Sequence, residues 1–573
     1  MDQQFDVVVV GSGAGALLAA IRATDAGLKA VVLEKTGLVG GTSAISGGGI
    51  WIPCNDDMPK AGLRDSVDAA FKYVKACAKG LASDDRILAY VETARELVQY
   101  LRILGVPYRC MPKYSDYYPH VAGSLPGGRT MDPVDYDAAR IGLDDLAMLR
   151  PTNPGQLILG RMHMNAFEAR SMLARELRSK FTLIGLLLRY FLDYPWRSKT
   201  RRDRRLTGGQ ALMGGLLAAA RQRQIPIYLN TALYSLVREN GAIRGVLAER
   251  EGQTLKFAAR RAVILGAGGF ERNLVMREKY LPRPTNANWP ATPPAANTGD
   301  AIRAGEEAGA ALHLMEHTWG VPTLDVPGED KFRGLFVERS LPGCMVVNAR
   351  GERFLNESGP YPEFQQAMFA NHAATGGAIP AWIVFDADFR AKNPIGPLMP
   401  GSAVPDRKLN KNWLGQVYWK GETLDDLARQ IGVDAEGLKR SAERMSSFAA
   451  SGKDMDFDRG GNSFDRYYGD PRLKNPNLGP IRKAPFYAMK LWPGDIGTKG
   501  GLLTDRDARV LDLQGQVIEG LYCVGNNSAS VMGPAYPGAG STLGPAMTFA
   551  YRAVAQITGQ AIALVRTDLL EST

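Results

Sequence analysis

Three segments that lie far apart in the chain carry tyrosines in settings where a phenol could do chemistry. Tyr117 is the first tyrosine of the run D-Y-Y, Tyr361 closes the run R-F-L-N-E-S-G-P-Y, and Tyr536 opens the run Y-P-G-A-G, which ends at Gly540. A tyrosine hydroxyl donates hydrogen bonds, and it acts as a base where its neighbours tune its pKa from about 10. On spacing alone, Tyr117 and Tyr361 are more typical of half-buried rings and loop anchors. Their chemistry therefore depends on the elements that position them.

The N-terminus contains an element that would hold a cofactor. Residues 5–33 contain an apolar strand, a glycine-rich turn, a helix of small residues and a second apolar strand, and Glu34 follows. The turn and the helix start contribute Gly11, Gly13, Gly15 and Ala16. Such a turn lets the backbone approach a pyrophosphate and directs helix N–H groups at it. Glu34 lies 18 residues beyond Ala16, where a carboxylate binds ribose hydroxyls. The sequence therefore predicts a Rossmann-like dinucleotide-binding domain.

Two clusters of glycines and hydroxyls follow the ribose-binding acid. Their exposed N–H and hydroxyl groups would continue along a diphosphate and a ring, so we expect the cofactor to extend beyond adenosine. The residues that we expect to contact it there are Lys35, Gly41, Thr42, Ser43 and Gly48. Later glycine turns and the start of the last helix return to the same place, and they add Gly268, Gly525, Asn526, Ser541 and Leu543.

The motifs resemble those of known flavoproteins. The pattern E-K-x-x-x-x-G-G-T-S-A-x-S-G-G is similar to the flavoproteins grouped with fumarate reductase and 3-ketosteroid dehydrogenases, which bind FAD. The motif Y-P-G-x-G resembles the 3-ketosteroid Δ1-dehydrogenases, and the similarity covers nearly the whole chain except residues 165–206. The resemblance implies FAD as the cofactor. We expect non-covalent binding, because no histidine stands in the pattern expected for covalent attachment.

The same resemblance implies a role for each tyrosine motif. Tyr536 and the N–H of Gly540 would hold and polarise the 3-keto oxygen of a steroid. Tyr361 would take the proton from carbon 2 with the help of Tyr117, while hydride leaves carbon 1 for the flavin. The sequence leaves open whether Tyr117 or Tyr118 assists. The resemblance also implies steroid degradation and an external electron acceptor, such as a quinone.

Three other functions remain as alternatives. A 3-ketosteroid Δ4-(5α)-dehydrogenase belongs to the same flavoprotein group, although Tyr117 and the Y-P-G-x-G motif favour the Δ1 reaction. Fumarate reductase chemistry is less well supported, because it needs histidines and arginines placed for a dicarboxylate. An alternative of another class is a flavin-independent interaction protein that binds membranes through its basic segment.

The pattern of elements predicts an α/β fold with two units. Residues 1–316 form the first part of a Rossmann-like FAD-binding domain with an inserted antiparallel meander, whose strands are expected at 234–237, 243–248 and 254–257. A separate buried strand is expected at 262–265. Residues 317–484 form an α+β catalytic domain, and residues 485–573 return to the FAD-binding domain.

Composition narrows the class of protein. The chain of 573 residues is 45% apolar, which is enough to bury two cores. Its five cysteines are an odd number without a C-x-x-C pair, which suggests a reducing compartment, and its five histidines show no metal-ligand spacing. No apolar run reaches the roughly 18 residues that cross a bilayer, and no signal peptide precedes the first strand. We therefore expect a cytoplasmic protein without a metal site.

Residues 165–206 differ from their surroundings. They combine an apolar run at 181–192 with 11 basic and 4 acidic residues, so they carry +7 of the formal net charge of +10. Leucines and aromatics flanked by arginines are typical of a segment that lies on an anionic membrane, here the inner face of the cell membrane. Such docking would suit steroids with an alkyl side chain, such as cholest-4-en-3-one. An internal helix with a solvated basic end is an equal alternative. Nucleic-acid binding is not expected, because no nucleic-acid fold accompanies the charges.

Overall fold

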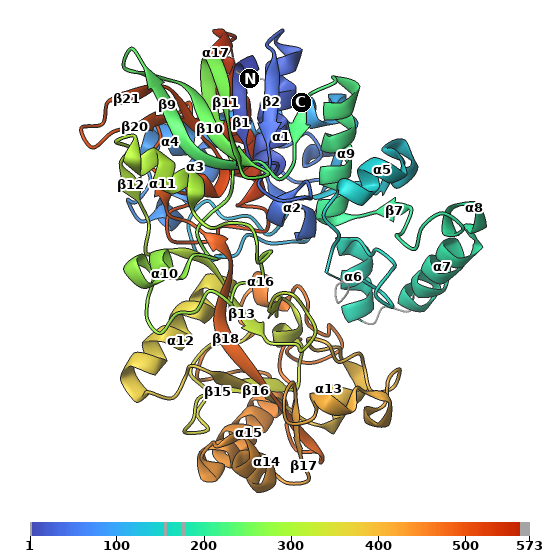
Figure 1. Ribbon diagram of the computed structural model, residues 1–573. Helices are drawn as coiled ribbons and strands as arrows, with labels where there is room; N and C mark the ends of the chain where they lie inside the picture. Colours follow the sequence, from blue (N-terminus) through green and yellow to red (C-terminus); the bar gives the residue numbers. More distant parts are fainter. Residues whose placement is uncertain (1–2, 154–156, 175–177, 562–573) are drawn as a thin grey trace.

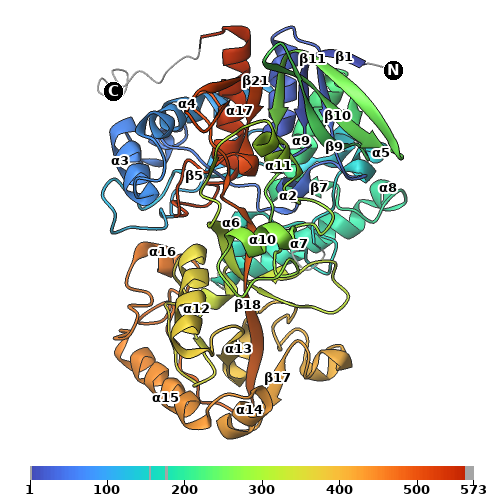
Figure 2. The same cartoon turned by 60° about the vertical axis from the view of Figure 1, so that its left-hand side comes forward.

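The computed structural model describes residues 3–153, 157–174 and 178–561. Two units are stacked one above the other in Figure 1, and the N-terminal strand lies in the upper one. Each unit has its own sheet, and the long strand β18 of the lower unit extends towards the upper one (Figure 2). This arrangement confirms the predicted α/β fold with two units.

The first unit is built on the predicted βαβ unit. Parallel strands β1 (Gln3–Val10) and β2 (Ala30–Leu33) flank α1 (Ala14–Asp25). Val7 and Val9 pack into one core with the helices, whereas Val8 and Val10 pack into a second core on the other face. Burial on both faces explains the unbroken apolar sequence. The sheet has the order β20-β21-β11-β1-β2-β8, with β20 (Arg509–Leu511), β21 (Val517–Cys523), β11 (Gln253–Leu265) and β8 (Ile227–Tyr228).

The meander differs from the prediction in one respect. It consists of β9 (Ala232–Glu239), β10 (Ala242–Arg250) and the first half of β11. The strands predicted at 254–257 and 262–265 are two halves of β11, a single strand of 13 residues. Its first half pairs antiparallel with β10 and its second half pairs parallel with β1. No glycine or proline interrupts residues 253–265, so one extended segment serves both the meander and the central sheet.

Helices of the first unit bring the C-terminal part of the chain beside the N-terminal turn. The C-terminal helix α17 packs directly on α1 and on α4, as Figure 1 shows for the upper unit. The helices around this core are α2 (Gly41–Ile45), α3 (Val67–Ala78), α4 (Asp84–Ile103), α5 (Gly142–Met148), α9 (Gly208–Gln222), α10 (Leu274–Tyr280), α11 (Asp300–Glu307) and α17 (Leu543–Thr558).

Short strands in one small sheet and two pairs complete the first unit. They form a sheet of β3 (Ile50–Trp51), β5 (Thr130–Pro133) and β4 (Tyr108–Cys110), the pair β6 (Tyr136–Asp137) with β7 (Arg205–Leu206), and the pair β12 (Leu312–His313) with β19 (Gly501–Leu502).

The second unit is organised around a long strand. β18 (Phe486–Thr498) pairs antiparallel with β13, β16 and β17, so the sheet of this unit continues beyond the boundary predicted at residue 484. The other strands are β13 (Thr318–Leu324), β14 (Arg333–Gly334), β15 (Cys344–Val347), β16 (Ala381–Phe385) and β17 (Trp419–Gly421). The helices are α12 (Tyr361–Thr375), α13 (Ala387–Lys392), α14 (Leu424–Ile431), α15 (Ala435–Ser451) and α16 (Ser463–Arg466).

The basic and apolar segment forms a helical projection. It contains α6 (Ala166–Leu173), α7 (Arg178–Leu192) and α8 (Tyr194–Arg197), and α7 and α8 extend sideways from the body in Figure 1. Over the ranges that the structure describes, no helix has the length and apolar character needed to cross a bilayer.

Candidate active site

The turn between β1 and α1 is shaped for close approach of a ligand. Gly11 has a φ of +102°, and a Cβ there would lie 2.4 Å from the carbonyl oxygen of Gly266. A Cβ at Gly15 would lie 2.8 Å from the carbonyl oxygen of Ala546 in α17. The first turn of α1 carries no acidic residue, so its positive end suits a phosphate. The residues present therefore fit a dinucleotide cofactor at this position.

Glu34 is fixed at the end of β2. It is buried, and its carboxylate accepts hydrogen bonds from the Ser12 hydroxyl at 2.5 Å and from the Thr36 N–H at 2.8 Å. Ser12 also accepts a hydrogen bond from the Gly40 N–H at 3.0 Å, so it links the two glycine-rich loops. Ser12 carries no sequence signal of this role, because the pattern of the glycine turn does not specify the residue at its position.

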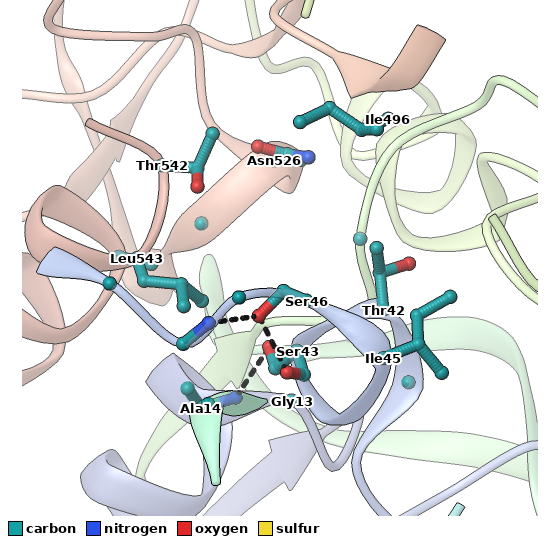
Figure 3. A pocket seen from close by; sticks show the side chains of 18 of the residues that line it. Gly13, Ala14, Thr42, Ser43, Ile45, Ser46, Ile496, Asn526, Thr542 and Leu543 are labelled. Carbon is teal, nitrogen blue, oxygen red and sulfur yellow. Dashed lines mark hydrogen bonds between the residues drawn. The ribbon is translucent and has the colours of Figure 1, made fainter. Parts of the chain in front are cut away.

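One cavity of about 530 Å³ connects these loops to the tyrosine motifs. In Figure 3, Ser43 and Ala14 lie on one side of it, and Asn526 and Thr542 lie across the same space. The predicted cofactor residues that line it are Gly11, Gly13, Gly15, Ala16, Glu34, Lys35, Gly41, Thr42, Ser43, Gly48, Gly268, Gly525, Asn526 and Leu543.

Ser541 is placed differently from the other predicted cofactor residues. Its side chain is buried, and its hydroxyl donates to the carbonyl of Gly538 at 2.7 Å and accepts from the N–H of Gly538 at 3.1 Å. Ser541 is absent from the cavity lining and instead closes the turn of the Y-P-G-A-G motif. A serine in a glycine-rich segment carries no sequence signal that separates these two roles.

The three predicted tyrosines lie together in the same cavity. The hydroxyl oxygens of Tyr117 and Tyr361 are 3.4 Å apart. The Tyr117 ring stacks on Tyr536 with ring centroids 5.2 Å apart, and the Tyr361 ring meets Tyr536 edge-on at 6.0 Å. Each comes from a different part of the chain: a loop before β5, the start of α12, and the segment before α17. The fold therefore brings the three motifs to one point.

Burial affects the hydroxyls of Tyr117 and Tyr536 in the same direction. Burial raises the pKa of Tyr536 above its ordinary value, while hydrogen bonding to Thr542 and to the backbone of Gly540 opposes that rise. Burial, together with Tyr361 and Tyr536, raises the pKa of Tyr117 well above its ordinary value. Both phenols therefore remain proton donors at neutral pH.

A cation lies against the ring of Tyr361. The guanidinium carbon of Arg339 lies 5.0 Å from the centre of the Tyr361 ring, and Arg339 is buried. The structure therefore places a buried cation against the ring of the predicted base. The sequence motifs did not indicate Arg339, because it lies outside all of them, between β14 and β15.

Tyr118 points away from this group. Its hydroxyl donates to Glu363 Oε1 at 2.6 Å and accepts from the Tyr536 N–H at 3.1 Å. Tyr118 is absent from the cavity lining, whereas Tyr117 is part of it.

Comparison with known proteins agrees with this geometry. The family described as FAD binding domain matches residues 6–543. A 3-oxosteroid 1-dehydrogenase from Comamonas testosteroni is 56% identical, with 100% of both chains covered. A solved 3-ketosteroid delta1-dehydrogenase from Sterolibacterium denitrificans, in complex with 1,4-androstadiene-3,17-dione, is 54% identical, with a TM-score of 0.95 over 98% of this chain and 100% of that one.

A more distant structure shares the fold alone. The 3-ketosteroid-delta4-(5alpha)-dehydrogenase from Rhodococcus jostii RHA1 is 22% identical, with a TM-score of 0.64 and 97% of both chains covered. The glycine-rich loops that line the cavity and these matches together define a flavoprotein oxidoreductase that uses FAD. Within that class, the chain belongs to the 3-oxosteroid 1-dehydrogenase family. The resemblance found in the sequence motifs is confirmed, and the alternative of a flavin-independent interaction protein is wrong.

Proposed function

We propose that this chain is an FAD-dependent 3-ketosteroid Δ1-dehydrogenase, which introduces the double bond between carbons 1 and 2 of a 3-ketosteroid. The observation that supports this most is the meeting of Tyr117, Tyr361, Tyr536 and Gly540 in the cavity that the cofactor loops also line. A carbonyl-polarising pair and a base next to a flavin site are what removal of two hydrogens beside a ketone requires.

The residues of the chain supply the proton chemistry. The Tyr536 hydroxyl and the Gly540 N–H donate hydrogen bonds to the 3-keto oxygen, which acidifies the hydrogens on carbon 2. Tyr361, beside the Arg339 guanidinium, takes the proton from carbon 2. Bound FAD would supply the acceptor for the hydride from carbon 1, and an external acceptor such as a quinone would restore the oxidised cofactor.

Tyr117, and not Tyr118, is the assisting tyrosine in this proposal. The Tyr117 hydroxyl lies 3.4 Å from that of Tyr361 and 3.4 Å from that of Tyr114, so the three form a chain of hydroxyls. Such a chain can pass the abstracted proton onward and stabilise the Tyr361 phenolate. The Tyr118 hydroxyl is engaged by Glu363 and by the backbone of Tyr536.

We expect FAD to be bound non-covalently through the residues that line the cavity. Denaturation in acid is then expected to release all the yellow colour into the supernatant. His163 lines the cavity and is the histidine at which to look for a covalent link. Colour that stays with the precipitated protein, or a flavin adduct in its mass spectrum, would contradict this expectation.

The Δ4-(5α)-dehydrogenase remains the nearest alternative reaction. A saturated 5α-3-ketosteroid can lose hydrogens at either position, so the position of the new double bond separates the two activities.

We also propose that α7 docks reversibly on an anionic membrane. Phe181, Ile184, Leu188, Phe191 and Leu192 are exposed and recur at helical spacing, so they form one apolar face. Lys180, Arg189, Lys199 and Arg201 are also exposed on this projection. Exposed apolar side chains beside cations suit a headgroup region, with on the order of 1 kcal/mol per basic residue near an anionic surface.

The docking surface adjoins the cavity. α6 contacts α7, and Ala166 and Ala169 of α6 line the cavity. Docking on the inner face of the cell membrane would therefore bring the cavity close to steroids dissolved in the bilayer. This placement supports a preference for steroids that carry an alkyl side chain.

Three substitutions test the docking proposal. The variant F181S/F191S/L192S is expected to lose co-sedimentation with vesicles that contain phosphatidylglycerol, because it removes the most exposed apolar side chains of α7. Salt is expected to weaken vesicle binding by the parent protein only in part, because salt screens the electrostatic contribution and leaves the contribution of the buried apolar side chains. Activity on a short, soluble 3-ketosteroid should remain unchanged.

A matched control places serine at two equally exposed apolar positions elsewhere. The variant I103S/L513S changes side chains that are each 79% exposed and lie outside the projection, and it should bind vesicles as the parent does. Docking through α7 is contradicted if the triple variant binds as well as the parent, or if the parent does not bind.

A further inference from the structure

Lys499 is a buried cation beside the active site with no role in the proposed chemistry. It follows β18, its side chain is 0% exposed, and its Nζ donates to the carbonyl oxygens of Gly533, Pro534 and Ala535 at 3.3, 2.7 and 2.5 Å. Three acceptors match the three N–H groups of an ammonium. Burial lowers the pKa of Lys499 to about 7, so keeping a lysine here is costly.

The three carbonyls belong to the residues that immediately precede Tyr536. Lys499 therefore holds the segment from which the carbonyl-polarising tyrosine extends. Its Nζ also lies 4.2 Å from the ring centre of Trp319, and that ring meets the Tyr536 ring edge-on at 5.0 Å. The Trp319 indole N–H donates to Asn526 Oδ1 at 3.1 Å, which fixes the ring. One side chain thus supports both the backbone and the ring of Tyr536.

A second contact holds the same residue from another side. The Tyr118 hydroxyl accepts the Tyr536 N–H at 3.1 Å and donates to Glu363 Oε1 at 2.6 Å. Glu363 lies in the first turn of α12, which also begins with Tyr361. The hydrogen bonds from Tyr536 through Tyr118 to Glu363 therefore link the tyrosine that binds the ketone to the helix that carries the base.

We propose that Lys499 and Tyr118 are positioning residues that set the place of the Tyr536 hydroxyl relative to Tyr361. The proposal rests on the proposed function, in which Tyr536 polarises the ketone. A displacement of about 1 Å at a polarising donor lowers a rate by about a hundredfold. Neither residue touches the cavity, so both act through Tyr536.

The test uses the FAD-loaded enzyme with K499M and Y118F. Each substitution removes the hydrogen bonds and keeps a side chain of similar size. Each is expected to lower kcat by about tenfold or more, with KM for the steroid and the FAD content changed less than about twofold. In a Y536F background, neither substitution should lower kcat further, because the group through which it acts is already gone.

Arg86 provides a matched control. It is also a buried cation, it donates to the carbonyl of Ala529 at 3.0 Å, and it lies 5.3 Å from the ring of Phe549, and both of these partners are outside the segment 533–536. R86M also removes a buried cation, so this variant shows the effect of lost stability alone. Its kcat, measured below its melting temperature, should match that of the parent.

A second measurement does not depend on turnover. Hydrogen exchange of the backbone amides in residues 533–540 should be faster in K499M and in Y118F than in the parent and in R86M. If the parent protein has no activity on steroids, the proposed function is contradicted. The exchange measurement would still show whether Lys499 and Tyr118 hold the segment that carries Tyr536. The proposal is overturned if exchange there is unchanged, or if K499M and Y118F lower kcat equally with and without Tyr536→Phe. Y118F carries the test if K499M does not fold.

Discussion

Tyr361→Phe is expected to lower kcat by about a hundredfold or more, which is the usual effect of removing a positioned base. The hydroxyl is the only group that the substitution removes, and it lies 3.4 Å from the Tyr117 hydroxyl. FAD binding should persist, because the cofactor loops do not depend on that hydroxyl. Steady-state kinetics on a 3-ketosteroid, with the flavin absorbance as a measure of FAD content, checks this result.

Two other tyrosines calibrate the effect of Tyr361→Phe. Tyr100 donates to Asp25 at 2.6 Å, away from the cavity, so Tyr100→Phe should leave kcat close to that of the parent. Tyr117→Phe should give a smaller loss than Tyr361→Phe, because Tyr117 assists the base. Turnover of Tyr361→Phe at the parent rate would remove Tyr361 from its role.

Tyr536→Phe is expected to lower kcat by about 10²- to 10³-fold, which is typical of losing one donor to a developing oxyanion. The hydroxyl belongs to a buried side chain, where the lower dielectric makes a hydrogen bond to a developing charge stronger than it would be in water. The Gly540 N–H remains and should preserve part of the rate.

The outcome that would contradict this role is specific. If Tyr536→Phe raises KM and leaves kcat unchanged, the hydroxyl contributes to substrate binding alone and does not polarise the ketone in the transition state.

The sequence was most informative where chemistry and local conformation demand particular residues. A tight turn with a φ of +102° at Gly11 and a strand buried on both faces leave characteristic patterns, so the βαβ unit could be predicted closely. Tyr361 and Tyr536 were recognisable because their motifs resemble those of a family. Their proximity was not predictable from spacing, because it arises from the stacking of two units.

Other features depend on tertiary contacts that leave no local pattern. Ser541 was predicted to contact the cofactor and Tyr118 stands next to Tyr117, yet their hydroxyls point to Gly538 and Glu363. Lys499 and Arg339 contact residues that are distant in the chain. Side-chain direction in loops is set by the packing of the whole molecule, and no periodicity encodes it.

The basic segment shows the same limit. Its net charge of +7 did not show which of its cations are exposed, and several of its arginines make internal contacts. Arg202 donates to the Leu149 carbonyl at 3.0 Å, and Arg205 pairs with Asp135 and Glu168 at 2.6 and 2.8 Å. Part of the basic C-terminal end is therefore internal and not solvated, and the docking proposal rests on the exposed residues of α7 and its neighbours.

The central claim is tested most directly by anaerobic mixing of the FAD-loaded protein with one equivalent of a saturated 5α-3-ketosteroid. The proposed function predicts that the flavin absorbance bleaches and that the steroid recovered is the Δ1 product, with its double bond between carbons 1 and 2. A Δ4 product would instead identify the alternative dehydrogenase. A flavin that stays oxidised in the presence of 3-ketosteroids would contradict the proposed function altogether.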